Sequence, residues 1–178
     1  MLVVADARAE ECTPETRRAH RLSLGAGYSG VYFNGGTDGY YNVEGQRPSG
    51  HLGYAYSPER GLEVGADLVI FSGPIFLPAG MIRGYVSIGA RDIVELGLSW
   101  HVGALVASSG SRTWTGWGTW LGVDVRVWAT ERVGFQLAGH ALVARGKKPT
   151  DDSSPPNPYL GDLGVLAAGG ILSVFLSL

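Results

Sequence analysis

A glutamate, a serine and a histidine lie close together at Glu95, Ser99 and His101, and these residue types could form a nucleophilic hydrolase site. In a β-strand, residues at alternate positions share one face, so all three side chains would point the same way. The spacing places Ser99 and His101 about 7 Å apart along a strand, which we expect to be too long for a direct hydrogen bond. We therefore predict no catalytic residue here and interpret these side chains as filling for the inside of a β-structure.

The stretch that contains them, VELGLSWHVGALV at 94–106, alternates strictly between two kinds of residue. One face is apolar along its whole length, whereas the other is small, polar and charged. Such alternation is typical of a strand whose two faces meet different surroundings. The pattern alone is compatible with a barrel in water and with a barrel in a membrane.

Composition restricts the class of protein. The chain has 178 residues, enough for one domain, and only 17% of them are charged, compared with roughly 25% in ordinary globular proteins. The net charge of -2 provides no basic field, so we expect no nucleic-acid partner. The single cysteine, Cys12, excludes an internal disulfide framework, and no spacing of Cys and His indicates a metal site or a cofactor. No apolar run reaches the roughly 18–20 residues of a membrane-spanning helix, so a membrane protein of this sequence would cross as a closed sheet.

The N-terminal stretch MLVVADARAEE has the small-x-small pattern that ends a secretory signal peptide. The alternative is an ordinary disordered N-terminus. In both cases we expect residues 1–20 to be a leader or disordered segment and residues 21–178 to form the domain.

Eight segments have strand character, and the links between them alternate in length. The predicted strands are 21–33, 51–57, 61–71, 81–91, 94–105, 118–128, 133–144 and 163–178. The links SPERG, ARDI and ATER are short, whereas the other four are long and rich in Gly, Pro and Ser. In an up-and-down meander, links of one parity lie at one end. Short turns at one end and long loops at the other are typical of outer-membrane barrels.

The two faces of the predicted strands differ consistently. The apolar face carries no charge, whereas the opposite face combines glycine and serine with acids and bases. An eight-stranded lumen is just wide enough for side chains, and charges inside it must be paired because burying a lone ion is costly. We expect an interior charge network of Glu63, Asp67, Arg83, Arg91, Glu95, His101, Asp124, Arg126 and His140, with His51 nearby. The opposite orientation, with the apolar face inside, would make a soluble carrier.

Aromatic residues and loops supply the remaining candidates. Tyrosine and tryptophan lie mostly near the strand ends, where they would form membrane-interface girdles, although Trp100 is predicted in mid-strand. We expect recognition at the surface to involve loop residues, namely Tyr40, Tyr41, Trp114, Trp117, Lys147 and Lys148. The two lysines could contact lipopolysaccharide phosphates.

With these features the chain, over residues 21–178, resembles the eight-stranded outer-membrane β-barrel proteins such as the OmpA transmembrane domain, OmpX and OmpW. The resemblance rests on eight amphipathic strands, sorted links and the terminal strand GGILSVFLSL. It implies an all-β, antiparallel, up-and-down transmembrane barrel in the bacterial outer membrane, inserted by the barrel-assembly machinery. The family usually ends in an aromatic residue, whereas this chain ends in Leu178 with Phe175 three positions earlier.

We therefore expect a monomeric, non-enzymatic outer-membrane barrel with a packed polar lumen, surrounded by outer-membrane lipid and lipopolysaccharide. Its expected roles are membrane anchoring, envelope integrity or surface recognition. Two alternatives remain open. One is a soluble lipocalin-like carrier of an apolar ligand, and the other is an outer-membrane lipid hydrolase that uses Ser99, His101 and Glu95.

Overall fold

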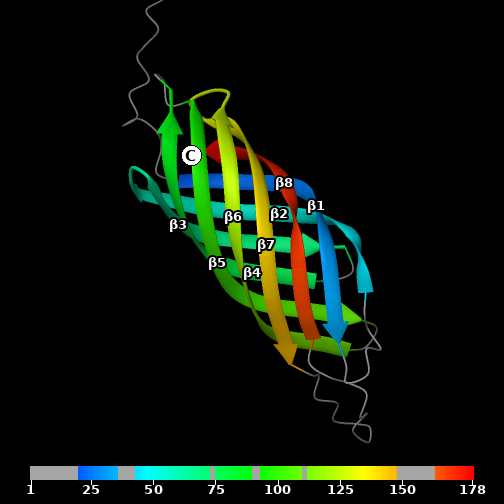
Figure 1. Ribbon diagram of the computed structural model, residues 1–178. Coiled ribbons are helices and arrows are strands. Elements are labelled where there is room, and N and C mark those ends of the chain that lie inside the picture. The colour runs from blue at the N-terminus through cyan, green and yellow to red at the C-terminus, as the bar shows by residue number, and fades with distance from the viewer. Residues whose placement is uncertain (1–19, 36–42, 73–74, 90–92, 110–111, 148–162) are drawn as a thin grey trace, which may run out of the picture.

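Eight antiparallel strands form a closed barrel in the computed structural model (Figure 1). The structure describes residues 20–35, 43–72, 75–89, 93–109, 112–147 and 163–178. The strands are β1 (His20–Gly35), β2 (Val43–Glu59), β3 (Leu62–Phe71), β4 (Ile75–Ile88), β5 (Val94–Ser109), β6 (Arg112–Trp128), β7 (Val133–Lys147) and β8 (Leu163–Ser177). Each strand pairs with its neighbours in the sequence, and β8 pairs with β1 to close the barrel. The predicted fold class is therefore confirmed, and the leader predicted at 1–20 lies almost wholly outside the described residues.

The register fixes how far the strands tilt. A path that starts at Val143 and follows paired residues once around the barrel returns to β7 at Val133, ten residues away. For eight strands this stagger corresponds to a tilt of about 40° from the barrel axis. A barrel of this size leaves an interior that side chains can fill.

Both ends of the described chain, at His20 and Leu178, lie at the same end of the barrel as the short turns; we call this the terminus end and its opposite the loop end. In the β2–β3 turn, Gly61 has a φ of 88°, a left-handed conformation that suits glycine. In the β6–β7 turn, the Thr130 hydroxyl accepts hydrogen bonds from the backbone N–H groups of Arg132 and Val133. These two turns match the sequence prediction.

At the loop end, the strands extend further than the sequence predicts. β2 begins at Val43 instead of residue 51, β4 at Ile75 instead of 81, and β6 at Arg112 instead of 118. Part of each predicted long loop is therefore strand. The sequence signal is misleading because proline and glycine suggest turns. Pro78 nevertheless lies within β4, where pairing with β5 is interrupted between Phe76 and Ala79, as expected for a residue without an N–H.

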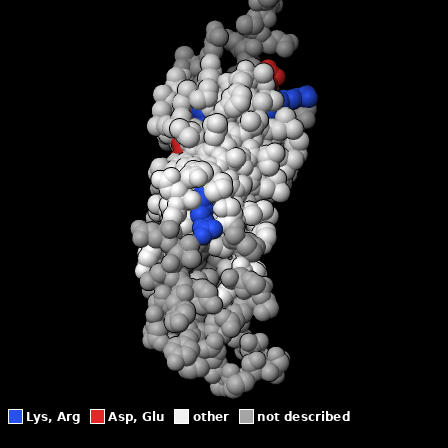
Figure 2. All heavy atoms as spheres, turned by 90° about the vertical axis from the view of Figure 1, so that its right-hand side faces the viewer, with Lys and Arg blue, Asp and Glu red and all other residues white. Residues whose placement is uncertain are grey.

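The outer wall of the barrel is apolar. The predicted apolar face points outward on every strand, with Leu98 60% and Val123 61% exposed. Figure 2 shows one side of the barrel, on which the described surface is largely free of Lys, Arg, Asp and Glu. The apolar stretch of β6 from Trp117 to Val127 corresponds to a belt about 25 Å high at this tilt, which matches the hydrocarbon-facing band of outer-membrane barrels.

Within the described part of the chain, no helix is long and apolar enough to cross a membrane.

Candidate functional site: the barrel interior

The interior near the terminus end contains a cluster of three arginines and three acids. Its members are Arg21, Glu63, Arg83, Glu95, Asp124 and Arg126, and all of them are buried. Glu63 is the centre of this ionic cluster, because its carboxylate contacts Arg21, Arg83 at 3.3 Å and Arg126 at 2.7 Å. The acids and the arginines are equal in number, so the cluster as a whole carries no net charge.

Arg83 of β4 reaches over β5 to Asp124 of β6 and holds it with two hydrogen bonds. Its Nε lies 2.9 Å from Oδ2 and its Nη2 2.7 Å from Oδ1. This two-pronged geometry is the strongest form of an arginine–carboxylate pair. Gly97 faces the Arg83 guanidinium, and a methyl group at this position would collide with it. The glycine therefore makes room for the arginine.

Aromatic rings surround the ionic cluster. The Arg83 guanidinium lies 5.0 Å from the ring centre of Tyr85, and that of Arg21 lies 5.0 Å from the ring centre of Trp128. The Trp128 indole also donates a hydrogen bond of 2.8 Å to Glu95. Cation–π contacts of this kind are strongest where water is excluded.

The sequence analysis missed Arg21. The signal was present, because Arg21 has the same parity as Ser23 and therefore lies on the polar face of β1. It was overlooked because it is the first residue of its predicted strand, so no preceding strand residue supports its place in the alternation. Arg91, which was predicted in the network, lies outside the described residues.

A second polar layer lies in the middle of the lumen and is built around Asp67. Its carboxylate contacts His101 Nδ1 at 3.1 Å and His51 Nε2 at 3.1 Å. The other nitrogen of each ring lies next to a serine: His101 Nε2 is 3.0 Å from Ser99 Oγ, and His51 Nδ1 is 3.5 Å from Ser173 Oγ. The five residues form a chain of polar contacts that links β5, β3, β2 and β8; we call it the histidine layer.

The expectation that Ser99 and His101 are too far apart for a hydrogen bond is wrong. The strand rise separates their Cα atoms, but the imidazole is long enough to bring Nε2 back toward the serine. The acid beside His101 is Asp67 from β3, not Glu95. Glu95 instead lies 3.6 Å from Arg21 and 3.7 Å from Arg83.

His140 of β7 lies next to this chain, and its Nε2 is 3.1 Å from Ser29 Oγ of β1. A cavity of about 60 Å³ lies between these groups and is lined by His51, Asp67, Ser99, His101 and His140 among others. This volume is enough for a few water molecules with polar partners. It is too small for a lipid substrate.

The order Ser99–His101–Asp67 is that of a hydrolase triad, but the backbone around Ser99 is paired within the sheet and the cavity beside it is small. An oxyanion hole needs backbone or side-chain donors that are free to face the reacting oxygen. Ser99 pairs with Arg83 on one side and Gly122 on the other, so the surrounding backbone is committed to the sheet. The cavity also lies between two packed layers, which leaves no described path for a substrate.

The third layer, at the loop end, is apolar. Large side chains fill it, including Phe71, Leu77, Leu105 and Trp114, and Leu105 has no exposed surface. We call this layer the apolar plug. Its members are Val31, Val69, Phe71, Ile75, Leu77, Ala79, Leu105, Ala107, Trp114, Trp120, Leu142, Ala144, Leu163, Val165 and Ala167. The lumen is therefore packed, but it is polar only at the terminus end and in the middle, which corrects the prediction of a packed polar lumen at the loop end.

The predicted loop residues have different positions. Trp114 is 5% exposed and lies inside the apolar plug, so its assignment to a recognition loop is wrong. The sequence places Trp114 in a loop because the glycines and threonines near it interrupt the apolar alternation. Trp117 and Lys147 lie exposed on the outer wall of β6 and β7. Tyr40, Tyr41 and Lys148 lie outside the described residues.

Trp100 lies away from the strand ends, so a role in a membrane-interface girdle does not account for its position. It faces outward in the middle of the belt, where an indole N–H has no water to bind. The N–H donates to Thr119 Oγ1 at 2.8 Å, and this hydroxyl donates in turn to the backbone carbonyl of His101 at 2.8 Å. Thr119 therefore satisfies the indole within the hydrocarbon layer.

In the part of the chain that the structure describes, no group of three or more His, Cys, Asp or Glu side chains is arranged to hold a metal ion.

No protein-family model matches the chain, and no curated relative matches it. Among solved structures, the chain is similar to Neisserial surface protein A (NspA), with a TM-score of 0.63 and 12% identity over 90% of this chain and 97% of that one. Two others are OprG from Pseudomonas aeruginosa, with a TM-score of 0.49, 12% identity and coverage of 91% and 97%, and Ail of Yersinia pestis, with a TM-score of 0.39, 12% identity and coverage of 86% and 97%. NspA supports the fold on its own.

The chain has the fold of the eight-stranded outer-membrane β-barrels. A closed barrel satisfies all its backbone groups internally, and an apolar outer belt around a charged interior is how such a barrel resides in lipid. The chain is thus an integral outer-membrane β-barrel. The soluble-carrier alternative required the reverse orientation, and the exposed leucines and valines together with the buried acids and arginines contradict it.

Proposed function

We propose that this barrel is a non-enzymatic, non-conducting anchor that holds its loop-end segments at the outer surface of the outer membrane. The packing of the lumen is the observation that supports this function. The ionic cluster, the histidine layer and the apolar plug follow one another along the axis, and the cavity lined by the histidine layer is only about 60 Å³. A solute would have to displace paired charges and a packed apolar core.

Conductance in planar lipid bilayers tests this proposal. We expect the refolded wild-type barrel to insert without producing stable channels. The variant Leu77→Gly/Leu105→Gly, which shortens two large side chains of the plug, serves as a comparison because it enlarges the lumen at the loop end while leaving the outer wall unchanged. Stable conductance steps of porin size from the wild-type protein would contradict the proposal.

The non-enzymatic part of the proposal rests on the geometry around Ser99, where the described backbone offers no oxyanion donors and the cavity no room for a lipid. We expect lipids incubated with the folded barrel to remain intact. Release of fatty acid by the wild-type barrel, together with its loss in a folded Ser99→Ala variant, would show the opposite.

We also propose that β8 carries the signal for insertion by the barrel-assembly machinery, and that the protein acts as a monomer. Phe175 is buried and packs edge-on against Trp128 at 4.7 Å between ring centres, so its ring is part of the interior. The outward side chains Leu172, Val174, Leu176 and Leu178 would then present the signal. Charged substitutions on this outer face, Leu172→Asp and Leu176→Asp, should block assembly in cells, whereas normal assembly of both would refute this assignment.

A further inference from the structure

Asp67, at the centre of the histidine layer, is a buried acid without an arginine partner among the described residues. The buried charged side chains of the described lumen include four acids and three arginines. All three arginines belong to the ionic cluster, where they contact the other three acids. The charged contacts of Asp67 are instead the rings of His51 and His101. The described lumen therefore lacks one positive charge unless a histidine of this layer is protonated.

The contacts of His101 require a hydrogen on both of its ring nitrogens. Nδ1 lies 3.1 Å from Asp67 Oδ2, and a bare nitrogen would place its lone pair against the carboxylate. Nε2 lies 3.0 Å from Ser99 Oγ, and the Ser99 hydroxyl donates its single hydrogen to the Gly122 carbonyl at 3.4 Å. The serine oxygen is therefore left as an acceptor for Nε2. A ring with hydrogens on both nitrogens is an imidazolium, which carries a positive charge.

The other two histidines of the lumen have contacts that fit a neutral ring. Nε2 of His51 lies 3.1 Å from Asp67, but its Nδ1 lies 3.5 Å from the Ser173 hydroxyl, which can donate to it. His140 contacts Ser29 Oγ through Nε2 at 3.1 Å, and its Nδ1 has no hydrogen-bond partner among the described residues. A single proton on His101 is thus enough to balance the buried charges.

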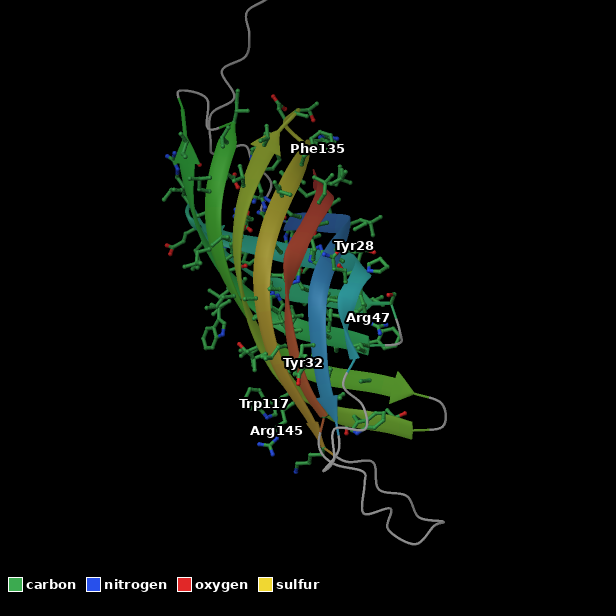
Figure 3. The ribbon with its side chains drawn as sticks, turned by 45° about the vertical axis from the view of Figure 1, so that its right-hand side comes forward. Tyr28, Tyr32, Arg47, Trp117, Phe135 and Arg145 are labelled. Atoms are coloured by element: carbon green, nitrogen blue, oxygen red, sulfur yellow. The ribbon has the colours of Figure 1, made fainter. Side chains whose placement is uncertain are left out.

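The surroundings of His101 favour a charged ring. It is stacked on Trp120, with 4.6 Å between the ring centres and an angle of 13° between the planes. A cation over an indole face is attracted to its electrons, and the attraction is larger where water is excluded. On β7, His140 lies halfway between Phe135 and Arg145, whose side chains project from the outer wall in Figure 3. The layer therefore lies in the middle of the barrel, away from both ends.

Charged and titratable side chains line the described lumen on either side of Asp67 and His101, and they come from seven strands. They are Arg21 of β1, Arg47 and His51 of β2, Glu63 of β3, Arg83 and Tyr85 of β4, Glu95 of β5, Asp124 and Arg126 of β6 and His140 of β7, whereas the described part of β8 contributes none. Arg47 is directed away from the layer, because its Nη1 donates to the Ser72 carbonyl at 2.9 Å.

We propose that His101 holds one proton at neutral pH as the counter-ion of Asp67, and that the histidine layer is a pH-sensitive element of the barrel. When the proton is lost, the carboxylate stays buried without a cation, and the folded state is destabilised. In the unfolded chain a histidine is neutral above about pH 7.5. The folded barrel then binds one proton more than the unfolded chain, so stability decreases as the pH rises.

Nitrogen-15 NMR of the histidine rings tests the charge directly. The full chain, labelled at histidine and refolded in detergent micelles, is measured at about pH 7.5, where an ordinary histidine is neutral. The loss of one ring's signals in His51→Gln, His101→Gln or His140→Gln assigns the spectrum. We expect two protonated nitrogens for His101, and one protonated and one bare nitrogen for His51 and for His140. A bare nitrogen on His101 would overturn the proposal.

The pH dependence of unfolding tests the consequence, after faster migration of the unheated protein has shown that each variant folds. Between about pH 7.5 and about pH 8.5, the unfolding equilibrium constant of the wild type should rise by about three- to tenfold, the range that loss of one proton allows. His140→Gln, the matched control, removes another histidine of the lumen and should keep this rise. Asp67→Asn/His101→Gln replaces both charges by amides, so the lumen stays balanced and the rise should disappear. No rise in the wild type, or an equal rise in the double variant, would contradict the proposal.

Discussion

The two ends of the lumen are filled by opposite kinds of side chain. At the terminus end, Glu63 and its three arginine partners are buried inside a wall whose outer face is apolar. At the loop end, Leu105 and Trp114 fill the interior, while the outer wall carries Arg145 and Lys147. At the terminus end, charges are inside and apolar side chains outside, which is the reverse of a water-soluble protein. At the loop end, apolar side chains are inside and charges outside, as in a water-soluble protein. The difference indicates that the barrel changes its surroundings from lipid to water along its length.

The two fillings are stabilised by different physics. A buried ion pair recovers its desolvation cost only when every charge has a partner, so each member depends on the others. An apolar plug depends on close packing, so its members contribute more independently. The comparison can be tested by substitutions that act on one filling at a time.

The largest effect should come from Glu63→Gln. This change leaves Arg21, Arg83 and Arg126 without their shared carboxylate, and breaking a buried ion pair from one side costs about 3–5 kcal/mol. We expect the free energy of unfolding, measured by denaturant titration in detergent or lipid vesicles, to fall by about that amount. The control Glu59→Gln lies at the exposed end of β2 and should leave stability unchanged. Equal stabilities of the two variants would show that the cluster is not a coupled unit.

Leu105→Ala should have the next largest effect, because it opens a hole in the apolar plug. Truncation of a fully buried leucine costs about 2–5 kcal/mol, and we expect a value near 3 kcal/mol in the same unfolding measurement. Leu98→Ala on the outer wall of the same strand is the matched control. Lipid fills the space that Leu98 vacates, so its cost should be well below that of Leu105→Ala. A greater loss from Leu98→Ala would mean that the plug is not packed.

Gly97→Ala should destabilise the barrel by about 1–3 kcal/mol, the usual cost of an added methyl group in a packed interior. The new methyl group would meet the guanidinium of Arg83, which its two bonds to Asp124 hold in place. Gly50→Ala is the control, since a methyl group there meets nothing within 4 Å. Thermal unfolding of the two variants in detergent checks this difference, and similar melting temperatures would argue against a tightly filled ionic cluster.

Trp100→Phe should have the smallest effect, about 0.5–1.5 kcal/mol. The change removes the indole N–H that donates to Thr119 but keeps an apolar ring in the belt. Thr119 keeps its bond to the His101 carbonyl, so no buried group is stranded. The unfolding free energies of Trp100→Phe, Thr119→Val and the double variant together form a double-mutant cycle, which gives the coupling energy between the two side chains. A coupling energy of zero would show that the bond contributes nothing in lipid.

The sequence was sufficient for the fold but only partly for the interior. Alternation of two residue types identified all eight strands, because each strand separates lipid from the lumen and a one-residue slip would reverse its faces. The strand ends at the loop end were missed because the alternation of apolar outward residues with polar inward residues stops where the apolar belt ends. There Trp114 and Leu105 face inward, and the outer residues become polar.

The interior partners were harder to predict than the interior positions. Parity places Asp67 and His101 on the same inner surface, but the stagger between their strands decides that they meet at 3.1 Å. Pairings between strands that are not neighbours, such as Arg83 of β4 with Asp124 of β6, also depend on side chains that reach over the strand between them. Neither property is readable from one strand at a time.

The central claim is the orientation of the wall, and spin labels at Leu98→Cys and Val123→Cys, each in a Cys12→Ser background, test it most directly. Oxygen accumulates in hydrocarbon, whereas a water-soluble nickel chelate is excluded from it. In lipid vesicles, both labels should be relaxed strongly by oxygen and weakly by the chelate, and a label at Glu59→Cys, at the exposed end of β2, should show the reverse. Strong relaxation of Leu98→Cys and Val123→Cys by the chelate, with no excess from oxygen, would contradict the account.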